Sequence, residues 1–308
     1  MPPRVTTDVD AALEVLRSGG LVAIPTETVY GLAADASNET AVRRIFAAKQ
    51  RPVDHPLIVH LARAEQLRDW AATVPASAAV LAAACWPGPL TVLVPRAAHV
   101  LDVVTGGLPS VGIRVPAHPL TTELLERFGG GLAAPSANRF GRVSPTTAEH
   151  VVRDLGDVPN GVDLVLDGGP CPVGVESTIV DCTVEPAQVL RPGGIPTEQV
   201  AALLNGALAP AAGPSRAAGM QASHYAPRCP VLLADTPADV ARLSAQQDDP
   251  LVIDDADDLV RYAQQLYHLL RRADDEHRSA VVALMPPAAG LGHAIRDRLV
   301  KAAADRAG

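Results

Sequence analysis

Residues 20–61 constrain the fold more than any other stretch, because apolar runs, turn residues and a helical pattern follow one another closely. The apolar run at 21–24 predicts a buried strand that ends at Pro25. Asn38 is placed to cap a helix whose apolar residues recur at helical spacing. Residues 56–60 predict a further strand. The stretch therefore predicts a strand–turn–helix–strand unit with hydroxyl side chains at one end and a basic pair at the other.

The basic pair, Lys49 and Arg51, stands at the carboxyl end of the predicted helix. Basic side chains complement the helix dipole there, and this accounts for either residue alone. Of the 26 basic residues in the chain, only Lys49 and Lys301 are lysines. A lysine in so arginine-biased a sequence indicates a position where a compact ammonium is required. We therefore give a functional interpretation of Lys49 slight preference.

Length and charge limit the classes of protein to consider. A chain of 308 residues allows two domains and a sizeable core. A net charge of −8 argues against a protein whose whole surface binds nucleic acid, but it leaves room for a local basic cleft.

The cysteines and the N-terminal sequence bear on the cell compartment. The four cysteines, Cys85, Cys171, Cys182 and Cys229, have no spacing typical of a metal site and indicate a reducing compartment. The N-terminal sequence lacks the order of a signal peptide, and no apolar run approaches ~20 residues. We expect a soluble cytoplasmic protein without a metal site of its own.

The remaining pattern predicts two α/β domains. The first two hundred residues mix helical segments with strands of both parallel and hairpin type, which favours an open twisted mixed sheet. Residues 206–219 have no periodicity and predict a linker. Residues 229–308 alternate strand and helix patterns and predict a smaller Rossmann-like domain. We therefore expect a first domain at 1–205, a linker at 206–228 and a second domain at 229–308.

Several polar residues are weak signals when each is taken alone. Arg114 faces away from the apolar residues of its predicted strand, and a charge inside a sheet needs a partner or an anionic ligand. Ser136 and Asn138 favour turns, so their position after a strand needs no functional explanation. Ser177 and Arg191 are equally weak in isolation. No G-x-S-x-G, H-E-x-x-H, G-x-G-x-x-G or P-loop motif is present.

Taken together, these residues belong to blocks that occur in one order along the chain. The blocks are PTETVYGLAADA from residue 25, K-x-R at 49–51, PLIVH from 56, GIRVP from 112, PSAN from 135, ESTI from 176 and LRPG from 190. This order closely resembles the YrdC-like family, the threonylcarbamoyl-AMP synthases. The family's paired signatures, K-x-R and S-x-N, correspond to Lys49/Arg51 and Ser136/Asn138, and the resemblance covers about residues 8–205. The SHYAP segment at 223–227 resembles the linker of the longer, two-domain members.

The resemblance implies a reaction in which L-threonine, bicarbonate and ATP form threonylcarbamoyl-AMP and pyrophosphate, with Mg2+ on the triphosphate. A carbamate oxygen attacking the α-phosphorus needs in-line positioning and charge neutralisation rather than a nucleophilic side chain. The implied ATP site consists of Lys49, Arg51, Ser136, Asn138, Ser144, Arg191 and Tyr225, with Lys49 and Arg51 as the catalytic pair. The implied threonine site consists of Thr28, His60, Arg114 and Ser177, with Arg114 as a planar partner for the carboxylate.

The product would feed the threonylcarbamoyl modification at position 37 of ANN-reading tRNAs, in functional link with a downstream tRNA threonylcarbamoyl transferase. Three other interpretations stay open. One is a different carbamoyl-handling enzyme on the same fold, although the zinc-finger and acylphosphatase segments of hydrogenase-maturation proteins are absent. Another is a non-catalytic RNA-binding protein, which an isoelectric point near 5.6 disfavours. The third is an inactive paralogue, although both paired motifs are intact. Direct binding of tRNA is left open.

Overall fold

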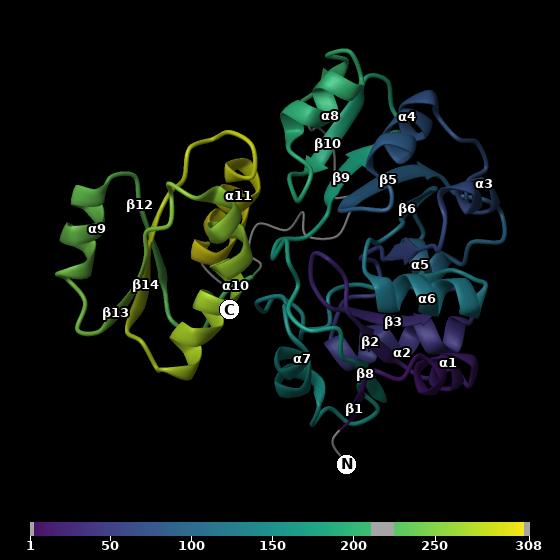
Figure 1. Ribbon diagram of the computed structural model, residues 1–308, viewed down its shortest axis with the longest axis horizontal. Helices are drawn as coiled ribbons and strands as arrows, with labels where there is room; N and C mark the ends of the chain where they lie inside the picture. The colour runs from purple at the N-terminus through teal and green to yellow at the C-terminus, as the bar shows by residue number, and fades with distance from the viewer. Residues whose placement is uncertain (1–2, 211–224, 305–308) are drawn as a thin grey trace.

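The computed structural model describes residues 3–210 and 225–304, which form two α/β units around two sheets (Figure 1). The large sheet has eleven strands in the order β1-β8-β2-β3-β7-β4-β6-β5-β9-β10-β11. Its strands are β1 (Arg4–Thr6), β2 (Val22–Ile24), β3 (Gly31–Asp35), β4 (Ile58–His60), β5 (Leu90–Pro95), β6 (Ser110–Arg114), β7 (Leu132–Ala133), β8 (Leu164–Leu166), β9 (Thr178–Asp181), β10 (Ala187–Arg191) and β11 (Leu208–Ala209). Parallel and antiparallel pairs both occur, as in β4–β6 and β2–β3. The predicted mixed sheet is confirmed.

Helices cover both faces of the large sheet. They are α1 (Val9–Arg17), α2 (Glu39–Lys49), the 3-10 helix η1 (Ala64–Gln66), α3 (Leu67–Trp70), α4 (Ala76–Cys85), α5 (Asp102–Thr105), α6 (Pro119–Phe128), α7 (Ala148–Leu155) and α8 (Thr197–Leu203). One apolar core contains residues of α2 and α4, and another contains residues of α1 and α6. The sheet is therefore buried between two apolar layers, which accounts for the near-continuous apolar runs of its central strands.

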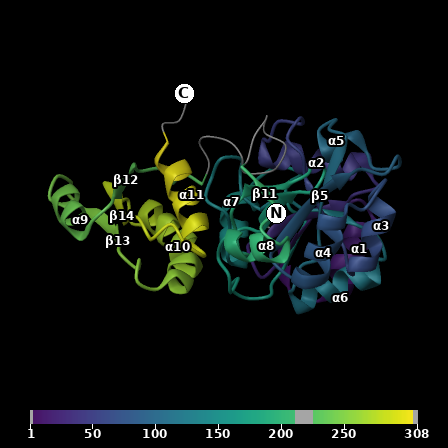
Figure 2. The same ribbon diagram turned by 90° about the horizontal axis from the view of Figure 1, so that it is seen from above.

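The second unit is a three-stranded parallel sheet in the order β12-β14-β13. Its elements are β12 (Val231–Ala234), α9 (Pro237–Ser244), β13 (Pro250–Ile253), α10 (Leu259–Asp275), β14 (Ala280–Leu284) and α11 (Gly292–Ala303). In both ribbon views α10 and α11 lie between this sheet and the first unit, whereas α9 lies on its far side (Figures 1 and 2). The strand–helix alternation confirms the predicted small Rossmann-like unit.

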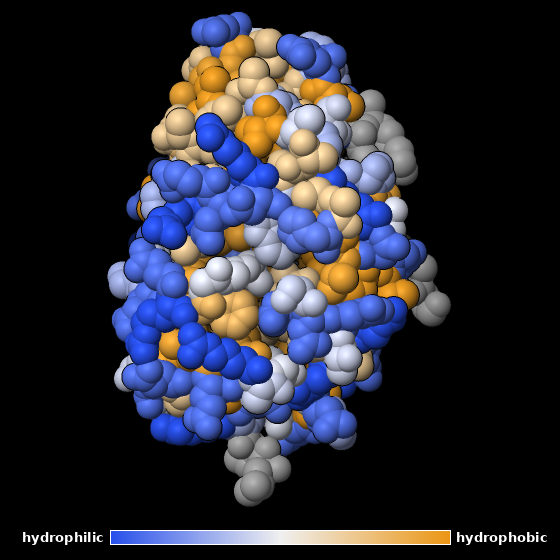
Figure 3. All heavy atoms as spheres, turned by 90° about the vertical axis from the view of Figure 1, so that its right-hand side faces the viewer, coloured by the Kyte–Doolittle hydropathy of each residue, from blue (hydrophilic) through white to orange (hydrophobic). Residues whose placement is uncertain are grey.

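The two units share a hydrophobic core. The cluster built on α10 and α11 also contains Val29, Val143 and Val175 of the first unit. On the face of the first unit seen in Figure 3, polar residues dominate and apolar ones are scattered between them. Within the described ranges, no helix has the length and apolar character that a membrane crossing requires.

The local structure of α2 follows its sequence closely. The Asn38 side chain accepts a hydrogen bond from the backbone N–H of Ala41 at 3.1 Å, so the predicted cap is confirmed. At the other end Gln50 adopts a left-handed conformation with φ of 54°, and the Arg51 N–H donates to the carbonyl of Phe46. This helix end sets the directions in which Lys49 and Arg51 leave the backbone.

Three strands have no counterpart in the sequence prediction. No element was predicted from the sequence for the residues of β3, which pairs antiparallel with β2 and with β7. Its sequence, GLAAD, has no β-branched residue, so local propensity gives no strand signal. β1 pairs only through long-range contact with β8. β11 lies within the range expected to be linker and pairs parallel with β10 at the sheet edge.

Candidate active site

A cavity in the first unit brings most of the predicted site residues together. Seven of the eleven line it, namely Arg51, His60, Arg114, Ser136, Ser177, Arg191 and Tyr225. The rest of its wall consists of Thr26, Val29, Gly31, Ile58, Ala134, Pro135 and Glu176. The other four predicted residues, Thr28, Lys49, Asn138 and Ser144, lie behind this wall.

Lys49 fixes the backbone of the turn that carries Ser136. Its side chain is buried, and Nζ donates hydrogen bonds to the carbonyl oxygens of Ser136 at 2.6 Å and Asn138 at 2.5 Å. Burial, with the Arg51 charge as a second cause, holds the pKa of Lys49 well below its usual value. In this conformation Lys49 acts on the cavity through the position of the turn.

Asn138, Ser144 and Thr28 likewise organise the wall from behind. Asn138 Nδ2 donates to the carbonyls of Arg139 and Arg142 at 2.9 and 2.8 Å, which closes the loop after the turn. The Ser144 hydroxyl donates to Glu176 at 2.6 Å. The Thr28 hydroxyl shares a hydrogen bond of 2.8 Å with that of Thr26.

Arg51 and Arg191, which are far apart in the sequence, both line the cavity. Arg51 Nη2 donates to the Pro56 carbonyl at 3.1 Å, and its guanidinium lies 5.7 Å from the centroid of the Phe140 ring. Burial lowers the pKa of Arg51 to about 10, so it is still a cation at neutral pH. Arg191 Nη2 donates to both the carbonyl and the hydroxyl of Ser177, at 2.8 and 3.1 Å.

Arg114 has an internal partner that the sequence analysis did not identify. Its Nη2 lies 2.9 Å from Glu27 Oε2, and both side chains are almost fully buried. Glu27 also accepts a hydrogen bond from the Ala117 N–H. Burial and the Arg114 charge lower the pKa of His60 to about 3, so its imidazole is neutral. The only sequence signal for Glu27 was its place directly before Thr28 in the block PTETVYGLAADA.

Glu176 is the second residue that the sequence analysis did not place in the site. Its carboxylate accepts hydrogen bonds from Ser144, from the Tyr267 hydroxyl at 2.7 Å and from Arg298 Nε at 2.9 Å. Burial alone would raise the pKa of Glu176, but the charges of Arg298 and Arg191 outweigh it and hold the pKa at about 2. Glu176 is therefore a buried carboxylate at which the second unit reaches the cavity.

The backbone beside Glu176 requires a glycine. A Cβ at Gly193 would overlap the carbonyl oxygen of Glu176 and the backbone nitrogen of Thr178. The Leu-Arg-Pro-Gly block can therefore pack directly against the Glu-Ser-Thr block, and this packing places Arg191 on Ser177.

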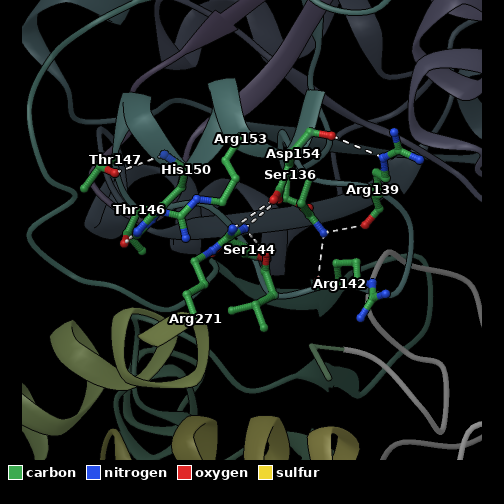
Figure 4. A network of polar contacts seen from close by, with 12 residues as sticks. Ser136, Arg139, Arg142, Ser144, Thr146, Thr147, His150, Arg153, Asp154 and Arg271 are labelled. Carbon is green, nitrogen blue, oxygen red and sulfur yellow. Dashed lines mark hydrogen bonds and ion pairs between the residues drawn. The ribbon is translucent and has the colours of Figure 1, made fainter. Parts of the chain in front are cut away.

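A separate hollow lies between α7 and α10, where both units contribute charged residues (Figure 4). Arg271 of α10 forms an ion pair of 2.6 Å with Asp154 of α7, and Arg153 pairs with Asp275. The arginines of its lining are Arg139, Arg142, Arg153, Arg228 and Arg271, and the aspartates are Asp154, Asp157, Asp274 and Asp275. Its charges nearly balance, and we interpret it as part of the interface between the units.

The structure describes the SHYAP segment from Tyr225 onward. Ser223 and His224 lie outside the described residues. Tyr225 is buried, lines the cavity and has a φ of 62°. Among residues 3–210 and 225–304, no group of three or more His, Cys, Asp and Glu side chains is arranged to hold a metal ion.

Fold and site define a two-unit α/β protein with a cavity suited to anionic ligands. Three guanidinium groups, several hydroxyls and a neutral imidazole converge on it, and buried positive charge favours phosphate or carboxylate groups.

Comparisons with known proteins then identify the family. Residues 14–193 match the Sua5/YciO/YrdC family model described as "Telomere recombination", and residues 195–304 match "Threonylcarbamoyl-AMP synthase, C-terminal domain". The chain is 38% identical to the threonylcarbamoyl-AMP synthase of Pyrococcus abyssi, with 94% of this chain and 92% of that protein aligned. It is also 38% identical to the synthase of Bacillus subtilis, with 96% and 92% aligned. The structure of P. abyssi Sua5 complexed with L-threonine superposes with a TM-score of 0.89 at 36% identity, covering 98% of this chain and 97% of that one. The chain belongs to the threonylcarbamoyl-AMP synthase family, in its two-domain form.

The pKa of Glu176 leads to a prediction about stability. Glu176→Gln should lower the free energy of unfolding near neutral pH by about 3–5 kcal/mol, because it removes the buried carboxylate that pairs with Arg298 Nε and leaves that cation only the partly exposed Asp297. The folded pKa of about 2 lies below the ordinary value of 4.5, so this contribution is complete above pH 4.5 and is lost as the pH falls towards 2. Urea unfolding at several pH values should show the difference between wild type and variant narrowing on acidification.

Asp275→Asn serves as the control, since it removes an ion pair between the units that is partly exposed. Its effect should stay below about 1 kcal/mol. A Glu176→Gln difference that does not change as the pH falls below 4.5 would contradict the assigned pKa.

Proposed function

We propose that this chain is an L-threonylcarbamoyladenylate synthase, which forms threonylcarbamoyl-AMP and pyrophosphate from L-threonine, bicarbonate and ATP. The observation that carries the proposal is the convergence of Arg51, Arg114 and Arg191 on one cavity with hydroxyl groups between them. The three cations suit a substrate set with a triphosphate and a carboxylate. The similarity to synthases over nearly the whole chain supports the same reaction.

We assign the ATP side of the cavity to Arg51, Ser136, Arg191 and Tyr225, with Lys49, Asn138 and Ser144 supporting them. Arg51 and Arg191 would neutralise the phosphates, and the Ser136 hydroxyl would donate to a phosphate or ribose oxygen. We propose Lys49 and Arg51 as the catalytic pair. Lys49 would act by fixing the carbonyl groups of the turn that carries Ser136. Tyr225 would lie over the nucleotide and exclude water from the labile mixed anhydride.

We assign the threonine side to Arg114, His60, Ser177 and Thr28. No hydrogen bond from Arg114 Nη1 is present in the described part of the chain, which leaves that nitrogen for the substrate carboxylate. Glu27 would hold the guanidinium in place while it binds. The neutral His60 imidazole adds no charge next to the substrate ammonium or the carbamate.

The chemistry needs positioning more than reactive side chains. The threonine amine forms a C–N bond with CO2 derived from bicarbonate and loses a proton, which gives a carbamate. A carbamate oxygen then forms a bond to the α-phosphorus as the bond from that phosphorus to the pyrophosphate oxygen breaks. The residues of this chain bind the two reactants in line and neutralise the leaving pyrophosphate. Mg2+ would enter with ATP on the phosphate oxygens, since Glu27 and Glu176 are both engaged by arginines.

We further propose that the protein acts in the cytoplasm and supplies the threonylcarbamoyl group for position 37 of ANN-reading tRNAs. A mixed anhydride is too reactive to accumulate, so a tRNA threonylcarbamoyl transferase would consume it. We propose a catalytic domain at residues 1–205, a linker at 206–228 and a second domain at 229–308, with β11 counted in the linker. The match of residues 195–304 to the C-terminal domain of synthases supports a two-domain synthase over another carbamoyl-handling enzyme, and the matched range begins before the proposed linker.

The reaction is tested by pyrophosphate release from ATP with and without L-threonine and bicarbonate, in the presence of Mg2+. We expect release that requires both co-substrates. Release without threonine would keep the adenylate chemistry and change the acceptor. The absence of any release, together with an RNA affinity that falls steeply with salt, would favour a non-catalytic RNA-binding protein.

Lys49→Met tests the role of the turn. The substitution keeps a long side chain but removes both hydrogen bonds to the turn, and a misplaced group in an active site can cost about 100-fold in rate. We expect pyrophosphate release to fall by about this factor while the circular dichroism spectrum is unchanged. Arg43→Met, on the exposed face of the same helix, is the control and should keep wild-type activity. Wild-type turnover in Lys49→Met would refute the assignment.

Arg114→Met tests threonine recognition. Losing a charge-assisted hydrogen bond should raise the KM for L-threonine roughly 10- to 100-fold and change the KM for ATP much less. The single variant leaves Glu27 as an unpaired buried charge, so the double variant Glu27→Gln/Arg114→Met is measured beside it. The threonine effect should persist in the double variant. Equal losses for threonine and ATP would argue against the carboxylate role.

A further inference from the structure

The second unit reaches the cavity through two buried side chains. Tyr267 of α10 donates its hydroxyl hydrogen bond to Glu176 Oε2 at 2.7 Å, and Arg298 of α11 donates Nε to the same oxygen at 2.9 Å. Arg298 Nη1 also donates to the carbonyl of Pro192 at 2.8 Å, directly after Arg191. Both blocks of the first unit that carry Ser177 and Arg191 are therefore held by α10 and α11.

The same two side chains hold Tyr225. The Tyr225 ring stacks on the Tyr267 ring with centroids 5.6 Å apart and an interplanar angle of 24°. The Arg298 guanidinium lies 5.3 Å from the centroid of the Tyr225 ring. Tyr225 has a φ of 62°, a left-handed conformation that is unfavourable for a bulky residue. Such a conformation persists only where the surroundings over-determine it, and here Tyr267 and Arg298 do so.

The packing of the two units against each other does not require the contacts of Tyr267 and Arg298 with Glu176 and Tyr225. Arg298 is fully buried, and burying a guanidinium is costly unless its contacts compensate for lost hydration. Its Nη2 has no hydrogen-bond acceptor among the residues that the structure describes. Apolar contacts and the Arg271–Asp154 ion pair already hold the units together. A buried polar network that joins the interface to the cavity wall at Glu176 indicates that it orients groups there.

We propose that Tyr267 and Arg298 are positioning residues of the synthase site, an inference that rests on the proposed function. Through the Glu176 carboxylate they fix the positions of Ser144 and of the Ser177 backbone. Through contacts with its ring they fix the orientation of the Tyr225 side chain. The second domain thus completes the nucleotide side of the cavity without touching the reacting atoms. The substrate-binding geometry of the first domain depends on the docked state of the second.

The test compares Tyr267→Phe with Tyr262→Phe in the full-length protein. Both tyrosines are fully buried on α10, but the Tyr262 hydroxyl donates to the Leu284 carbonyl inside the second unit. Each variant loses one buried hydrogen bond, so both should lose similar thermal stability. Tyr267→Phe should lower kcat/KM for ATP about tenfold, whereas Tyr262→Phe should stay within about twofold of wild type.

Arg298→Lys and Arg298→Met provide a second series. Lysine keeps the charge but not the planar fork, so we expect partial rescue of kcat/KM for ATP relative to methionine. Wild-type activity in both the Lys and the Met variant, each well folded, would indicate that Arg298 only holds the two units together.

Binding of ATP, measured by calorimetry without co-substrates, separates this inference from the proposed function. Weaker ATP binding in Tyr267→Phe than in Tyr262→Phe supports the positioning role, even if the wild type released no pyrophosphate and the reaction assignment failed. An active wild type in which the two variants match in kcat/KM and in ATP affinity would overturn the inference and leave the synthase assignment intact.

Discussion

The buried carboxylate of Glu176 is the interaction on which the arrangement of the site depends. It accepts hydrogen bonds from Ser144 of the first unit and from Tyr267 and Arg298 of the second, so one side chain connects both units to the cavity. A carboxylate in such surroundings is tolerated only while it is paired and hydrogen-bonded. The same requirement forces α10 and α11 into contact with the Glu-Ser-Thr block, and Gly193 permits the close approach of the neighbouring block.

Contacts within the protein keep the cationic side chains of the cavity buried and oriented. Arg114 is held by Glu27, Arg191 by the Ser177 carbonyl and Arg51 by the Pro56 carbonyl. Each of these contacts fixes the direction of a guanidinium in a poorly hydrated environment, where its interaction with an anion is stronger than in water. A reaction that depends on positioning two anionic reactants benefits from such preorganisation, because little reorganisation is needed when the transition state forms.

Much of the fold followed from local pattern. α2 begins after Asn38 and ends at Lys49, as the cap residue and the apolar spacing predicted, because capping and helical burial are both local properties. β3 was missed because its small residues have no strand propensity, and its identity comes from pairing with β2 and β7. Seven predicted residues line one cavity, yet Lys49 lies behind its wall with its ammonium on two carbonyls, which no spacing in the sequence could indicate.

The sequence by itself determined the family, the mixed α/β sheet, the presence of a second α/β unit and the set of side chains suited to phosphate and carboxylate. These properties depend on residue type and order, so the ordered sequence blocks are enough to predict them. Only the tertiary structure decided which charges are paired, since Glu27 meets Arg114 and Glu176 meets Arg298 across 87 and 122 positions of the chain. Partners so distant in sequence leave no periodic signal, because their contact results from the packing of whole elements rather than from local chain geometry.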